Sequence, residues 1–197
     1  MPRVWNGLRR VAEAGYHSHY VAIDGALVPR RADGRRFLDF GCGTGQFAER
    51  FPADRYVGID LTQPYIRYAA RHHQGSFAVM DGSCLGLAPA VFDGALVLGV
   101  FHHLPDELVR IGMHELHRVL IPEATLLVIE DVPPPTPWNV PGRIMHWLDR
   151  GDHIRTDHDY RSLFAPYFQV QESYTMRSGI CDYRVYVLAH QPHPVTR

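Results

Sequence analysis

The sequence of 197 residues has few cysteines, no surplus of charge and no long apolar run. Its three cysteines are an odd number without zinc-ligand spacing, so we expect reduced thiols in a cytoplasmic protein. Twenty basic residues face twenty-one acidic ones, which argues against the broad basic surface of a generic nucleic-acid binder. The longest apolar run, residues 94–101, is far short of the roughly 18–20 residues of a membrane span. No apolar segment follows the charged start, so we expect no signal peptide.

What the sequence does contain is the composition of a folded domain, with 46% hydrophobic and 21% charged residues. From residue 36 onward, segments typical of strands alternate with segments typical of helices, which predicts an α/β domain with a mostly parallel sheet. We divide the chain into an N-terminal helical lid segment (residues 1–35), a main domain (36–191) and a loose tail (192–197). Within the main domain, a second lid forms an insertion at residues 133–165.

The expected elements follow from hydrophobic patterning and from the positions of glycine and proline. Two short helices precede residue 30, and a proline-rich loop starts at residue 133. The last two expected strands alternate apolar and polar side chains and form a closing hairpin. We expect strands at residues 36–40, 56–60, 77–80, 92–98, 125–130, 169–176 and 183–190, and helices at 46–51, 63–72, 106–120, 144–150 and 159–164.

A glycine-rich turn, DFGCGTG, follows the first expected strand at residues 39–45. Glycines let the backbone approach a ligand closely, and the start of a helix offers free N–H donors. The spacing is G-x-G-x-G, whereas the dinucleotide fingerprint is G-x-G-x-x-G/A, which disfavours a nicotinamide oxidoreductase. A glycine turn that binds no ligand is the alternative when this motif is taken alone.

Acidic residues end the next two strands. Asp60 lies about twenty residues after the glycine turn, where an acid can accept hydrogen bonds from ribose hydroxyls. Asp81 and Gly82 end the third strand, where a carboxylate can meet an adenine amino group. The carboxyl ends of parallel strands meet at one edge of a sheet, so three polar strand ends together favour a nucleotide-type cofactor site.

The segments FLDFGCGTG, YVGIDLT, FAVMDGS and FDGALVLGVFHHLPD, in this order and spacing, resemble the motifs of class I S-adenosylmethionine-dependent methyltransferases of the type 11 group. The resemblance covers residues 36–131, with Glu123 and Ala124 in place of the usual glycines before the fifth strand. It implies a Rossmann-like, open, mostly parallel seven-stranded sheet with helices on both faces and an antiparallel last strand. It also implies S-adenosylmethionine as cofactor and S-adenosylhomocysteine as product. The implied cofactor-binding residues are Asp39, Gly41, Gly43, Gly45, Asp60, Leu61, Asp81, Gly82, Val100 and Phe101.

Two histidines, His102 and His103, follow the fourth strand at the same edge of the sheet. A neutral imidazole suits proton removal near neutral pH, so we take both as candidate catalytic bases; helix capping or local packing is the alternative. His102, Asp131, His153 and His158 could approximate a metal site, but they lack ligand spacing, and we expect no metal. Cys42, inside the glycine turn, fits there as a small residue rather than as a nucleophile.

The sequence therefore predicts a methyltransferase that acts on a small-molecule or lipid-like acceptor, with no nucleic-acid partner. The alternative is a cofactor-binding partner or sensor protein that has lost methyl transfer. Large side chains in both lid segments, such as Tyr16, Tyr20, Trp138 and Trp147, are expected to close the acceptor pocket. The acceptor atom and the oligomeric state are not indicated by the sequence.

Overall fold

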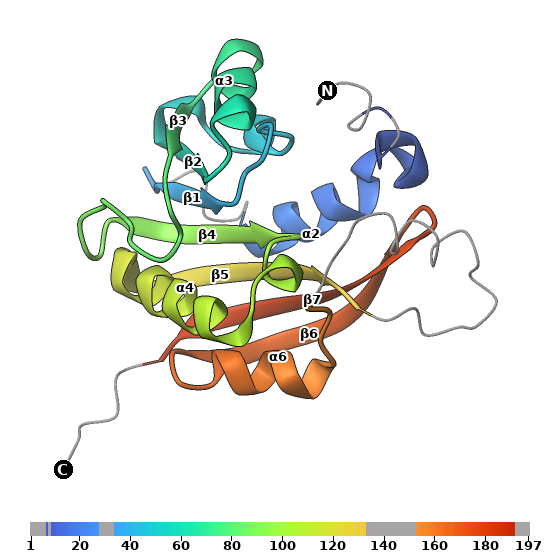
Figure 1. Ribbon diagram of the computed structural model, residues 1–197, viewed down its shortest axis with the longest axis vertical. Coiled ribbons are helices and arrows are strands. Elements are labelled where there is room, and N and C mark those ends of the chain that lie inside the picture. The colour runs from blue at the N-terminus through green and yellow to red at the C-terminus, as the bar shows by residue number, and fades with distance from the viewer. Residues whose placement is uncertain (1–6, 8, 28–33, 133–152, 192–197) are drawn as a thin grey trace.

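The computed structural model describes residue 7 and residues 9–27, 34–132 and 153–191 (Figure 1). The expected helix at residues 144–150, most of the second lid and the tail lie outside the described residues. The α-helices are α2 (His17–Leu27), α3 (Gln63–His72), α4 (Asp106–Val119) and α6 (Asp157–Phe164). Short 3-10 turns are η1 (Ala14–Tyr16), η3 (Ala48–Arg50), η4 (Ala53–Arg55) and η5 (Phe101–His103). The strands are β1 (Phe37–Phe40), β2 (Tyr56–Asp60), β3 (Ser76–Val79), β4 (Phe92–Leu98), β5 (Leu120–Asp131), β6 (Phe168–Ser178) and β7 (Cys181–His190).

The strands form one seven-stranded sheet in the order β3-β2-β1-β4-β5-β7-β6. Strands β1 to β5 pair in parallel, and β7 pairs antiparallel with both β5 and β6. The chain order reverses between β1 and β4, which lie side by side at the centre of the sheet. The predicted fold class, with a mostly parallel sheet and one antiparallel strand near the end, is confirmed. In an open α/β sheet, the carboxyl ends of strands at such a reversal border the ligand crevice.

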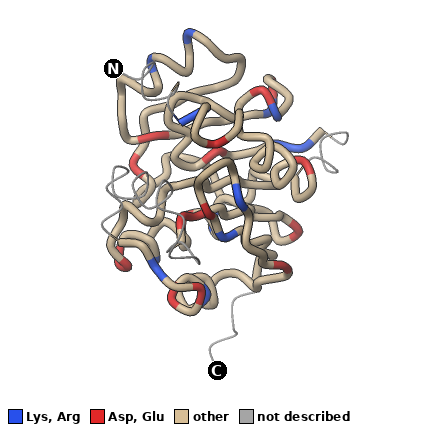
Figure 2. The backbone as a smooth tube through the Cα atoms, turned by 90° about the vertical axis from the view of Figure 1, so that its right-hand side faces the viewer, with Lys and Arg blue, Asp and Glu red and all other residues tan. Residues whose placement is uncertain are grey.

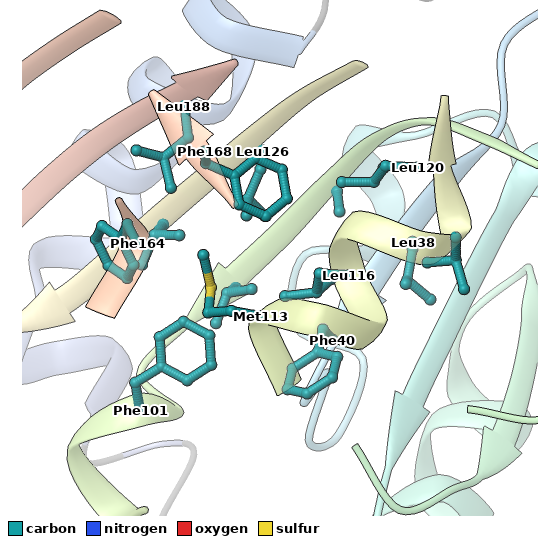
Figure 3. Packing of buried hydrophobic residues seen from close by; sticks show 14 of the residues in the cluster. Leu38, Phe40, Phe101, Met113, Leu116, Leu120, Leu126, Phe164, Phe168 and Leu188 are labelled. Carbon is teal, nitrogen blue, oxygen red and sulfur yellow. The ribbon is translucent and has the colours of Figure 1, made fainter. Parts of the chain in front are cut away.

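Helices cover both faces of the sheet, because the buried strands place apolar side chains on each face in alternation. Leu38 and Phe40 of β1 join the cluster beneath α4 and α6, which Figure 3 shows around Met113 and Phe164. Phe37 points to the opposite face and packs with α2. Figure 1 shows the same arrangement, with α4 and α6 in front of the sheet and α2 behind it.

Several elements have other bounds than expected; the closing strands β6 and β7 are each longer by two residues or more at the hairpin. The expected helix at residues 46–51 shrinks to the single turn η3, since Pro52 forces Phe51 into an extended conformation at φ -121° and ψ 153°. Strand β5 begins directly at the end of α4, five residues earlier than expected. Helix α6 begins two residues early, because the Thr156 hydroxyl accepts a hydrogen bond from the Asp159 amide and the two residues form a capping box.

Candidate functional site

The glycine turn after β1 is held close to the sheet by its backbone. The amides of Gly41 and Cys42 both donate to the Ile59 carbonyl, at 2.8 and 2.9 Å. Gly41 has φ +76°, and a Cβ atom there would lie 2.4 Å from the Val100 side chain. Glycine is therefore required at position 41 both for its conformation and for the close approach of the chain after β4.

Asp60 at the end of β2 ties this turn to the next strand. Its Oδ2 accepts a hydrogen bond from the Gly43 amide at 2.9 Å, and its Oδ1 accepts one from the Thr62 amide at 2.7 Å. Gly43 has open space where a Cβ atom would be. Because an ionised carboxylate offers about four acceptor positions, Asp60 can accept further hydrogen bonds from a ligand.

Asp39 is a buried carboxyl group beneath the turn, with 3% of its surface exposed. The Tyr56 hydroxyl donates a hydrogen bond to Asp39 Oδ2 at 2.7 Å. Burial raises the pKa of Asp39 to about 7; the Tyr56 hydrogen bond lowers it and the neighbouring Asp60 charge raises it further. The folded protein therefore binds a proton at Asp39 below neutral pH, unless a cation lies against it.

The end of β3 supplies an acid in an exposed position. Asp81 Oδ1 accepts hydrogen bonds from the Ser83 amide and hydroxyl, both at 2.8 Å, and these bonds hold the pKa of Asp81 below its usual range. A Cβ atom on Gly82 would lie 2.3 Å from the Phe40 ring. Residue 82 must therefore be glycine for the chain to pass over β1.

A cavity of about 680 Å³ lies over these strand ends, a size within the usual range for ligand pockets. It brings together most of the site residues expected from the sequence. These are Asp39, Gly41, Gly43, Asp60, Leu61, Asp81, Gly82, Val100 and His103.

Gly45, Phe101 and His102 do not line this cavity. Gly45 packs against α3 and β3, where a Cβ atom would lie 3.1 Å from Ala69, His73 and Phe77. The Phe101 side chain is fully buried in the core beneath α4, next to Phe40 and Phe164 (Figure 3).

His102 is buried behind the cavity, with 1% of its surface exposed. Its Nδ1 lies 2.8 Å from Glu130 Oε2, and its Nε2 lies 3.7 Å from Asp131 Oδ2. Its neighbour His103 does line the cavity, and the two imidazole rings are 4.0 Å apart. Of the two candidate bases, only His103 lines the cavity.

Glu130 and Arg155 hold the loop that carries these histidines. Glu130, fully buried at the end of β5, accepts hydrogen bonds from the backbone amides of residues 100–102 at 2.7–3.3 Å. On the other side, the Arg155 guanidinium donates to the carbonyls of Phe101 and Leu104 at 2.6 and 2.5 Å. Glu130 therefore holds the amides of the loop after β4, and Arg155 holds its carbonyls.

The N-terminal segment supplies part of the cavity wall, through Arg9, Glu13 and Tyr16. Tyr16 is one of the aromatic residues expected to cover the site, whereas the two charged residues are not among the predicted ones. Arg9 Nε donates to Glu13 Oε1 at 3.1 Å. Their spacing of four residues on a helix is the signal that could have identified them as a pair.

Neither a metal site nor a thiol nucleophile is supported in the described part of the chain. It holds no group of three or more His, Cys, Asp and Glu side chains suited to a metal ion. Of the four residues considered for one, His158 is 91% exposed on α6 and does not join His102 and Asp131. Burial raises the pKa of the Cys42 thiol, which keeps it protonated.

Residues 38–128 match the family model described as "Methyltransferase domain". This part of the chain, a little under half of its length, is similar to methyltransferase domains. S-adenosylmethionine-dependent methyltransferases are among the solved structures that the chain resembles. The glycine turn, Asp60 and Asp81 all lie within the matched residues of this methyltransferase domain.

Sequence relatives carry methyltransferase names as well. One relative is a demethylmenaquinone methyltransferase of Thermus thermophilus. The 110 aligned residues are 33% identical and make up 51% of this chain and 49% of that protein. Another is a tRNA (guanine-N(7)-)-methyltransferase of Anaeromyxobacter dehalogenans. The 83 aligned residues are 32% identical and make up 38% of this chain and 41% of that protein. The matches thus span less than half the length of either relative.

The methyltransferase fold extends over nearly the whole chain. A TehB-like SAM-dependent methyltransferase from Corynebacterium glutamicum superimposes with a TM-score of 0.69 at 17% identity, over 96% of this chain and 97% of that one. At this identity the likeness concerns the fold alone. No helix in the described residues has the length and apolar character needed to cross a membrane.

Proposed function

We propose that this protein transfers a methyl group from S-adenosylmethionine to a small, largely apolar or lipid-like acceptor. The observation that carries the proposal is the cavity itself. It is continuous from the glycine turn and Asp60, through the loop after β4, to the N-terminal segment. One cavity thus offers room for a cofactor at the strand ends and for an acceptor beside it.

The residues of the cavity fit the parts of this cofactor. Asp60 has acceptor positions for the ribose hydroxyls, and Leu61, 69% exposed, offers an apolar surface to the adenine. Asp81 can accept from the adenine amino group, and Asp39 can pair with the cationic methionine ammonium. The open space beside Gly43 leaves room for the methionine part against the backbone.

His103 is the residue we assign to proton removal. When bound, the cofactor supplies a methyl group activated by its sulfonium, so the protein must mainly place the acceptor in line with that group. An acceptor that arrives as a hydroxyl or an acidic carbon must also lose a proton. His103 lines the cavity next to Val100 and Leu104, at the end of the strand where the methyl group is expected.

The acceptor side of the cavity favours a small apolar molecule over a nucleic acid. Phe40, Leu98, Val100, Leu104 and Leu108 contribute apolar side chains to the wall. Acidic and basic residues are interspersed over the described residues (Figure 2), whereas nucleic-acid binding needs clustered cations. The relative named for demethylmenaquinone supports the same class of acceptor.

Calorimetric titration with S-adenosylhomocysteine tests the cofactor assignment. Asp60→Ala should weaken binding by about 1.5–3 kcal/mol, the worth of hydrogen bonds to a charged group. Asp54→Ala, at an acid on η4 with a side chain 74% exposed, is the matched control and should bind like the wild type. Equal affinity of Asp60→Ala and wild type would remove Asp60 from the site, and binding of NAD instead would favour an oxidoreductase.

Turnover separates an enzyme from a sensor protein. Release of S-adenosylhomocysteine should be measured with S-adenosylmethionine and a panel of small hydroquinones and phenols. Acceptor-dependent release supports the proposal. Tight cofactor binding without release for any acceptor in the panel would favour the binding partner or sensor.

A further inference from the structure

The N-terminal segment reaches the cavity through a turn of the backbone at residues 14–16, which we call the corner and whose conformation is rare. Ala14, Gly15 and Tyr16 follow one another at φ +48°, +72° and +64°. A bulky side chain in the left-handed region is a genuine outlier, and such residues persist only where the surrounding structure determines them. Something outside this segment must therefore hold it in place.

The corner directs two side chains into the cavity wall. Glu13 is 1% exposed and Tyr16 is 6% exposed, and both line the cavity. The Tyr16 ring makes edge contacts with Phe47 and His19, at 5.6 and 5.7 Å between centroids. Burial raises the pKa of Tyr16 to about 12, so its hydroxyl stays protonated and can donate a hydrogen bond to a ligand.

The tip of the β6–β7 hairpin holds the corner from outside the cavity. The Ser178 hydroxyl donates to the Glu13 carbonyl at 2.9 Å, and the Ile180 amide donates to the Ala12 carbonyl at 3.0 Å. Ser178 is 1% exposed, so its hydrogen bond is shielded from water. In Figure 1 this tip lies beside the N-terminal helices, although more than 160 residues separate them in the sequence.

Gly179 makes this approach possible. It has φ +57°, and a Cβ atom at this position would lie 2.0 Å from the Ala12 carbonyl oxygen and 3.0 Å from the Ala14 amide nitrogen. Both neighbours are backbone atoms that cannot rotate away. Any side chain at position 179 must therefore push residues 12–14 off the hairpin.

We propose that Ser178 and Gly179 are positioning residues of the cofactor site, which hold residues 12–16 so that Glu13 and Tyr16 close the wall against the bound cofactor. This inference rests on the proposed function, since it takes the cavity as the cofactor site. The hairpin tip is part of neither the cavity lining nor the matched methyltransferase domain. It acts only through the N-terminal segment.

The test compares Gly179→Ala with Gly34→Ala. Gly34 also has a left-handed φ of +81°, but the nearest atom to its added Cβ is 3.9 Å away, so this control carries the conformational strain without the clash. The dissociation constant for S-adenosylhomocysteine should rise at least about fivefold in Gly179→Ala, the loss of one ordinary hydrogen bond. It should stay at the wild-type value in Gly34→Ala.

Hydrogen exchange gives a local readout that a general loss of stability would not produce. The amides of Glu13 and Tyr16, which are hydrogen-bonded in the free protein, should exchange faster in Gly179→Ala. Amides in the central strands β4 and β5 should keep their wild-type protection. Added S-adenosylhomocysteine should slow exchange at residues 13 and 16 in the wild type and not in the variant.

Ser178→Ala is the second variant, in case the glycine substitution prevents folding. Its control is Ser162→Ala on α6, whose hydroxyl also donates to a backbone carbonyl at 2.9 Å, on a helix that does not line the cavity. Ser178→Ala should weaken ligand binding and speed exchange at residues 13 and 16, and Ser162→Ala should do neither. Wild-type affinity in both hairpin variants would overturn the inference, whereas a wild type that fails to bind S-adenosylhomocysteine would overturn the proposed function.

Discussion

Replacing Asp39 with asparagine should change how stability depends on pH. A carboxyl whose pKa rises from 3.8 to about 7 on folding favours the unfolded state by about 4 kcal/mol once the pH exceeds both values. Between these values the unfolded chain is ionised at Asp39 while the folded chain keeps the proton. Below pH 3.8 Asp39 is protonated in both states, and the free energy of unfolding is at its full value. As the pH rises from 3.8 to about 7, Asp39 lowers the free energy of unfolding by about 1.4 kcal/mol per pH unit. Above pH 7 no further loss occurs.

The Asp39→Asn substitution removes this slope while it retains an oxygen that can accept from the Tyr56 hydroxyl, at the cost of a new buried amide group. Urea unfolding of wild type and Asp39→Asn should be followed from about pH 5 to about pH 8. The difference between the two free energies should shift in favour of the variant by about 3 kcal/mol over this range and level off above about pH 7. Titration of other groups contributes equally to both proteins, so the difference isolates Asp39.

Asp54→Asn, an exchange at an exposed acid, should give a curve parallel to the wild type. Parallel curves for Asp39→Asn would refute the reasoning, because they would mean that Asp39 titrates alike in the folded and unfolded states. At about pH 8, the same variant should bind S-adenosylhomocysteine more weakly, since the ligand ammonium loses a negative partner. A more stable protein with a weaker site is the expected pair of results.

Other substitutions separate the residues that meet a ligand from those that hold the site. His103→Ala should lower turnover by about 10²–10⁴ with little change in cofactor affinity, measured by steady-state kinetics and calorimetry. His102→Ala should instead lower the free energy of unfolding by about 1–3 kcal/mol, because the Glu130 carboxylate loses a buried hydrogen-bond partner; a loss of turnover without a loss of stability would contradict this role. Gly82→Ala should destabilise the fold and weaken cofactor binding, since its Cβ atom must displace the Phe40 ring; an unchanged melting temperature would show that the ring moves freely.

The hydrophobic pattern of the sequence predicted the fold, because most helices and strands are marked by the residues within them. The apolar run of β4 and the amphipathic pattern of α3 gave the correct bounds, 92–98 and 63–72. The early start of β5 was not predicted, since its exposed residues 122 and 123 interrupt the apolar pattern. Pairing of Leu120 with Phe92 of β4 starts the strand there against local preference, before a register shift leads to the pair Gly94 and Thr125.

The sequence predicted residues that line the cavity at the strand ends, but not the contacts made by residues far apart in the chain. The glycines of the turn and Asp60 follow their strands at a fixed spacing, so the sequence alone marks them as candidates for ligand contact. The two adjacent histidines look equivalent in the sequence, and the structure separates them because Glu130, 28 residues away, binds one of them in the core. Nothing local to the N-terminal segment shows that Gly179 and Ser178 contact it.

The hydrogen bonds of Glu130 and Arg155 to the loop after β4 affect the thermodynamics of ligand binding. A loop whose amides and carbonyls are already bonded to buried charges has little conformational freedom left to lose. Ordering it costs the incoming cofactor almost nothing, so more of the contact energy remains as affinity. The N-terminal corner, by contrast, is attached to the hairpin tip by hydrogen bonds between neutral groups, which are weaker than bonds to charged groups, so it keeps more conformational freedom for a bound cofactor to remove. Any gain in affinity by redesign should therefore come from the corner rather than from the loop.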